Sequence, residues 1–180
     1  MPEWVDELRA GLAEPLPPTG WPAAVGALAF LLLVALGRAA DGWMPFLDGI
    51  NLLFHEAGHP IFGLLGWETL ALLGGTLMQV LVPLLVAAHF RWRRHPLGVA
   101  LGLQWAAQNL LNIARYMADA RAQVLPLVGG GEHDWGTLLG QWHLLSRDTA
   151  LAGGVAALGW IGMALPLLWL TWRALRRSGT

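Results

Sequence analysis

Long runs of apolar residues alternate with short polar stretches along the chain. A helix needs about 20 apolar residues to cross a bilayer, with a range of about 17–25. Four runs meet that length cleanly, at roughly 21–37, 69–89, 96–117 and 149–172. A fifth run, roughly 43–66, contains ionisable side chains, but the gaps on both sides of it are too short for a separate soluble domain. The pattern therefore predicts an all-α fold, a polytopic membrane bundle of about five transmembrane helices in one domain over residues 21–180.

Two shorter segments have an amphipathic pattern. In residues 1–20, apolar residues recur at helical spacing from Trp4 to Leu12, and a Pro-rich stretch follows them. This spacing predicts an N-terminal amphipathic helix lying on the membrane surface. After Gly129–Gly131, Asp134 is a plausible helix N-cap. The apolar face of a short surface helix would then be formed by Trp135, Leu138, Leu139 and Trp142.

Composition narrows the class of protein. Hydrophobic residues make up 56% of the chain and charged residues 13%, about half the share usual in soluble domains. This excludes an ordinary cytosolic globular domain and a disordered chain. Eleven Trp residues against one Tyr fit a bilayer protein. Membrane lipid is therefore the expected partner, and the Ala- and Gly-rich composition with only Arg as a basic residue suggests a prokaryotic inner (cytoplasmic) membrane.

Charge and cysteine content exclude several chemistries. The chain has no Cys, so any metal must be held by His, Asp or Glu. It has no Lys either, which excludes Schiff-base and P-loop chemistry. A net charge of −1 gives no broad attraction for nucleic acid.

The fifth apolar run contains an HExxH motif, formed by His55, Glu56 and His59. Residues i and i+4 share one helix face, so two imidazoles can grip one Zn²⁺ at about 2.0–2.1 Å. Glu56 is then placed to act as a general base on water at the metal. Ionisable groups at bilayer depth cost about 2.5–3.5 kcal/mol or more, so they mark function by default. Gly58, within the motif, leaves room for a neighbouring helix to approach closely.

A catalytic zinc needs a third protein ligand and an open position. Asp48 is excluded as that ligand because seven residues of helix place it about 10.5 Å from His55, so a helix-start or surface role is expected. Asp119 is favoured, because it ends a spanning helix and a helix positions a ligand better than a loop. His133 is the alternative, as a ligand or as a partner of one. Asp134 is expected to be a cap, and an ion pair with a neighbouring arginine remains open for Asp119.

Polar residues on the predicted spans at 69–89 and 96–117 could line the bundle interior or assist the site. A stripe of amide side chains should face the bundle interior, and it comprises Gln104, Gln108, Asn109 and Asn112. A hydrolytic site would also need a donor for an oxyanion. Gln79, Asn109 and Asn112 are candidates, and the sequence does not choose among them.

The motif and its setting resemble the site-2-protease family of intramembrane zinc metalloproteases. The resemblance covers roughly residues 44–120 and depends on the HExxH helix, on Gly74-Gly75 in the next span, and on an Asp ending a later helix. It implies that His55, His59 and Asp119 bind one zinc ion. It also implies that Glu56 activates water to cut a peptide bond of a transmembrane protein or peptide in or near the bilayer.

Two other functions are compatible with the residues. The chain could be a non-catalytic, metal-stabilised subunit or scaffold of a larger assembly, in which case a closed site of His55, His59, Asp119 and His133 is expected. A metal-ion transporter would need a continuous polar path and several carboxylates in its helices. That reading ranks last because few carboxylates are available there.

Overall fold

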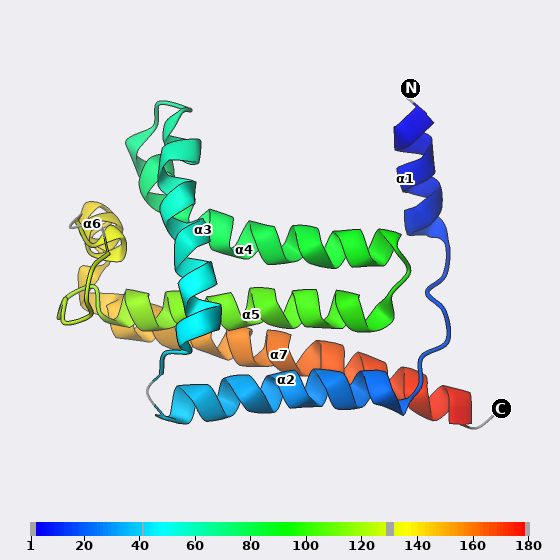
Figure 1. The fold of residues 1–180 in the computed structure, drawn as a ribbon. Helices are drawn as coiled ribbons and strands as arrows, with labels where there is room; N and C mark the ends of the chain where they lie inside the picture. The colour runs from blue at the N-terminus through cyan, green and yellow to red at the C-terminus, as the bar shows by residue number, and fades with distance from the viewer. Residues whose placement is uncertain (1–2, 41, 129–131, 179–180) are drawn as a thin grey trace. The chain divides into compact units, whose positions relative to one another are not determined.

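The computed structural model describes residues 3–40, 42–128 and 132–178 (Figure 1). Within these ranges every regular element is helical, which confirms the predicted all-α class. In chain order the elements are α1 Glu3–Ala13, α2 Trp21–Ala40, α3 Pro45–Gly63, α4 Glu68–Trp92, α5 Pro96–Ala118, α6 Asp134–Gln141, the short 3₁₀ helix η1 Leu145–Arg147 and α7 Asp148–Ser178.

Three of the predicted spans are confirmed as helices long and apolar enough to cross a membrane. They are α2, α4 and the stretch Leu145–Ser178 that joins η1 to α7. Large apolar side chains on them are exposed, such as Leu36 on α2 and Leu168 on α7, as expected where lipid is the solvent. The other two predicted spans, 43–66 and 96–117, are helical as α3 and α5, and their crossing of the membrane stays a prediction.

The described chain divides into two compact units, and α4, α5 and α7 each contribute to both. Unit 1 comprises Met1–Trp43, Val82–Ala106 and Gly162–Thr180. Small residues dominate its core, where Ala24, Ala27, Ala100 and Leu170 pack together. The buried Gln104 amide donates to the Ala27 carbonyl at 3.1 Å and to the Met163 carbonyl at 3.0 Å, which ties three helices of this unit together.

Arginines of unit 1 hold the N-terminal segment. The Arg91 guanidinium donates to the carbonyl oxygens of Gly11, Leu12 and Glu14, at the C-terminal end of α1. The Arg173 guanidinium donates to the Leu16 and Pro17 carbonyls. The predicted helix within residues 1–20 is therefore confirmed as α1, while its place on the membrane surface stays a prediction, as does the single domain over 21–180.

Unit 2 comprises Met44–Leu81 and Ala107–Ile161 and contains every candidate ligand. Its core is formed by apolar faces of α5, α6 and α7, with Ile113, Met117, Trp135, Leu138, Leu139 and Ala152 buried together. The predicted short helix is confirmed as α6, but the predicted cap is wrong. The N-cap is His133, whose Nδ1 accepts from the Gly136 N–H at 3.1 Å, and Asp134 is the first helical residue.

Helices α3 and α4 cross in close contact at two glycines. A Cβ atom added to Gly58 would lie 2.1 Å from the Gly74 carbonyl oxygen, and one added to Gly74 would lie 2.5 Å from the Gly58 oxygen. Real Cβ contacts are never this short, so the crossing requires glycine on both helices. The close approach predicted at Gly58 is confirmed.

Candidate metal site

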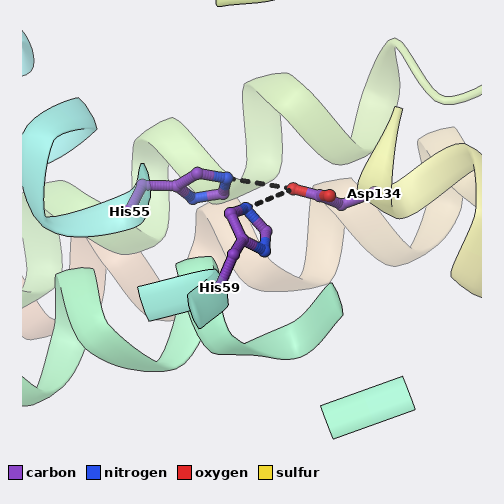
Figure 2. A group of neighbouring side chains, drawn as sticks. All are labelled: His55, His59 and Asp134. Carbon is purple, nitrogen blue, oxygen red and sulfur yellow. Dashed lines mark hydrogen bonds and ion pairs between the residues drawn. The ribbon is translucent and has the colours of Figure 1, made fainter. Parts of the chain in front are cut away.

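Two imidazoles and one carboxylate meet in unit 2. One turn of α3 places the rings of His55 and His59 with their centroids 4.8 Å apart, nearly perpendicular at 79°. Asp134, at the start of α6, points its carboxylate between them (Figure 2). Its Oδ2 lies 2.9 Å from His55 Nε2 and 3.4 Å from His59 Nε2. One donor atom from each of these three residues lies within 4.8 Å of the others.

This donor set fits a divalent metal ion such as zinc. Tetrahedral coordination at about 2.0–2.1 Å separates neighbouring ligand atoms by about 3.3 Å. The separations of Asp134 Oδ2 from the two imidazole nitrogens, 2.9 and 3.4 Å, lie on either side of that value. Two His and one carboxylate are also one of the three-ligand sets found in catalytic zinc sites, which keep their fourth position for water or substrate.

Neighbouring groups fix the orientation of both rings. His59 Nδ1 lies 2.9 Å from the Ala71 carbonyl oxygen, which can only accept, so Nδ1 carries a proton and Nε2 is the ring atom that faces the site and would bind a metal. The His55 ring lies against Gly75, where an added Cβ would be 2.6 Å from its Nε2. Glycine in α4 therefore provides the space that the His55 ring occupies.

The site is buried on one side and open on the other. His55 is 7% exposed and Asp134 is 6% exposed, whereas the His59 side chain retains 26% of its exposure. Burial alone would raise the pKa of Asp134, but hydrogen bonds with His55 and His59 outweigh it and lower that pKa to about 2. The carboxylate is therefore ionised at neutral pH and can serve as a ligand.

Glu56 lies beside this group without belonging to it. Its side chain is exposed. Tyr116, on α5, accepts the Asp134 backbone N–H at its Oη, at 3.2 Å. The predicted base is one residue from His55 and three from His59 on α3, and its side chain is accessible.

The two predicted third ligands, Asp119 and His133, pair with each other outside the three-residue group. Asp119 accepts the backbone N–H groups of Val124 and Leu125, both at 3.0 Å. Its Oδ2 lies 3.6 Å from His133 Nε2, and burial lowers the pKa of His133. Their role as ligands stays a prediction, and the acid that the structure brings to the two histidines is Asp134.

The sequence predicts a helix cap rather than a ligand at Asp134, because its position after a glycine run is typical of a cap. The signal that could have identified it is the pair His133–Asp134 itself. Two neighbouring ligand-type residues compete for one cap, and only one of them can take it.

Another buried acid, Asp48 on α3, has entirely different neighbours from those of Asp134. It is in the first turn of the helix, as expected, but is 1% exposed, so the surface alternative is wrong. Its carboxylate accepts from the side-chain amides of Gln108 at 2.6 Å and Asn112 at 2.7 Å, and from the Met44 N–H at 2.7 Å.

The predicted interior-facing stripe of amide side chains on α5 is confirmed, since Gln104, Gln108 and Asn109 are fully buried.

The chain was compared with protein-family models, with curated proteins and with solved structures, and no match was found.

Proposed function

We propose that this chain is a membrane-embedded zinc metallopeptidase that hydrolyses a peptide bond in or near the bilayer. The observation that carries the proposal is the meeting of His55, His59 and Asp134 around one point, with Glu56 adjacent to the first of them in sequence. The membrane-helix character of the chain and the resemblance of its HExxH helix to site-2 proteases support the same conclusion.

Each residue of the site has a distinct role in this proposal. His55, His59 and Asp134 hold the metal ion. A zinc ion in such a site lowers the pKa of water to about 7 and polarises a carbonyl group. Glu56 takes a proton from the attacking water and returns it to the leaving amine. The exposed side of His59 gives a peptide access to the site.

The geometry favours this enzyme over a non-catalytic scaffold. A structural zinc site is closed by four protein ligands, whereas a catalytic one uses three. Among the described residues, the group that could hold a metal has three members. A transmembrane protein or peptide is the proposed substrate, and a prokaryotic inner membrane is the proposed location.

The decisive experiment replaces the base and leaves the ligands intact. Glu56→Gln should retain zinc at full stoichiometry and lose hydrolysis of unfolded casein or a transmembrane reporter peptide by about 100-fold or more, since a general base contributes about 10²–10⁴. Glu68→Gln, in the first turn of α4, is the matched control and should keep both properties. A Glu56→Gln protein that cleaves at the wild-type rate would remove Glu56 from the mechanism.

A further inference from the structure

Tyr116 is the only tyrosine in the chain, and it lies against the ligand set. Its ring stacks on the His133 ring with centroids 4.1 Å apart and an angle of 26° between the planes. It also meets the His55 ring edge-on, with centroids 6.1 Å apart. These two contacts fix the position of the phenol beside the proposed metal.

The hydrogen bonds of the phenol leave its proton available. A tyrosine hydroxyl can both accept and donate. Tyr116 Oη accepts the backbone N–H of Asp134 at 3.2 Å, which aligns it with a ligand residue. Within the ranges that the structure describes, the phenol proton has no acceptor.

Two of the amides expected as candidate oxyanion donors are committed elsewhere. Asn112 donates to Asp48 Oδ1 at 2.7 Å, and Asn109 donates to Asn51 Oδ1 at 3.2 Å. Both bonds belong to the buried network around Asp48 on α3. Tyr116, by contrast, contacts two residues of the ligand set, His55 and Asp134.

We infer that Tyr116 is a further catalytic residue, whose hydroxyl donates a hydrogen bond to the oxyanion formed during peptide hydrolysis. This inference rests on the proposed function. When the water oxygen bonds to the carbonyl carbon, the carbonyl π pair moves to its oxygen and Glu56 receives the proton from water. The Tyr116 O–H stabilises that negative oxygen and stays protonated. The carbon–nitrogen bond then breaks, and the amine leaves with the proton from Glu56.

The backbone N–H of a ligand residue and the ring of His133 hold the phenol in place. An oxyanion donor is typically worth about 10²–10³ in kcat. Since the hydroxyl is held by the chain before substrate arrives, it needs no reorganisation at the moment of reaction.

The test uses Tyr116→Phe, which keeps the ring that stacks on His133 and removes only the hydroxyl. Zinc content should be unchanged, and kcat on casein should fall about 100-fold with KM within about twofold. Two inhibitors give a readout that does not need turnover. Affinity for a phosphonamidate peptide, which carries an oxyanion, should fall about 100-fold, whereas affinity for benzyl mercaptan, which has none, should stay within about twofold.

Equal weakening of both inhibitors, or an unchanged kcat, would overturn the assignment. If wild-type protein bound both inhibitors but cleaved no substrate, the proposed function would fail. The difference in affinity between the two inhibitors would still show whether Tyr116 donates to an oxyanion. If Tyr116→Phe did not fold, 3-fluorotyrosine incorporated at this one tyrosine gives a single ¹⁹F resonance. That resonance should move when phosphonamidate binds and stay in place with the thiol, and no movement with phosphonamidate would again overturn the inference.

Discussion

Among the buried aspartates of unit 2, Asp48 and Asp134 have opposite surroundings. Asp48 is 1% exposed and Asp134 is 6% exposed, so burial does not distinguish them. Asp48 receives N–H donors on both carboxylate oxygens, from Gln108, Asn112 and the Met44 backbone. Asp134 instead directs one oxygen at the Nε2 atoms of two imidazoles.

The difference shows what makes a buried acid a ligand. Hydrogen bonds from neutral amides stabilise the Asp48 charge and occupy its lone pairs, so that carboxylate is already satisfied. The Asp134 carboxylate instead faces the Nε2 atoms of His55 and His59, which can bind a cation together with it. Residue type and burial therefore identify neither role, and the chemistry of the neighbouring atoms identifies both.

The largest effect should come from removing the carboxylate charge at each site in turn. Asp134→Asn should weaken zinc binding by about 100-fold or more, because even outer-shell partners of a ligand are worth about 10–100-fold. Asp48→Asn should keep zinc and destabilise the fold by about 1–3 kcal/mol, since an amide N–H would then face the Met44 N–H. Chelator-competition titration and unfolding in a denaturing detergent measure the two quantities. If Asp48→Asn lost zinc and Asp134→Asn kept it, Asp48 rather than Asp134 would be the ligand.

A smaller loss of metal should follow from filling the space beside His55. In Gly75→Ala the new Cβ would lie 2.6 Å from the His55 ring, which must shift from its present position. We expect zinc affinity to fall by about 10–100-fold, as when the orientation of a ligand is disturbed. Gly49→Ala on α3 is the control, because an added Cβ there meets no atom within 4 Å. Equal affinity in the two variants would show that the ring does not depend on this space.

Acid should destabilise the metal-free protein through Asp134. The pKa of Asp134 is about 2 in the folded state, below its ordinary value of 3.8. Its contribution is therefore complete above pH 3.8 and is lost as pH falls through 2, and the shift corresponds to about 2 kcal/mol. Stability measured across this window should fall in wild-type protein and much less in Asp134→Asn. An identical acid dependence in the two proteins would contradict the assignment.

The smallest effect on metal binding is expected at Asp119. Its carboxylate accepts two backbone N–H groups in the turn after α5, so Asp119→Asn should disturb that turn and leave zinc affinity within about twofold. The same titration measures it. Loss of zinc would instead support the ligand set implied by the site-2-protease resemblance.

Much of the fold follows from local sequence. Apolar runs of spanning length are sufficient to identify α2, α4 and α7, because length and hydropathy alone decide whether a helix can cross lipid. α3 and α5 were also found as helices, although their polar residues lower their hydropathy. The division into two units was not predicted, since it depends on contacts between segments distant in the chain.

Only the part of the site formed by residues close together in sequence could be predicted. His55 and His59 are one helical turn apart, so their shared face follows from the sequence. Asp134 lies 79 residues from His55, and no periodicity reports a contact over that distance. The error also has a local cause, because His133 takes the cap and thereby leaves the Asp134 carboxylate available to the imidazoles.

The glycine contact between α3 and α4 changes the meaning of the HExxH motif in this chain. Gly58 stands at a position that the motif leaves variable, yet Gly74 permits no side chain there. Anyone redesigning this centre, or grafting it into another bundle, must therefore transplant the matching glycines of α4 with the histidines. A graft of the five motif residues alone would separate the two helices and carry the ligands away from their partner.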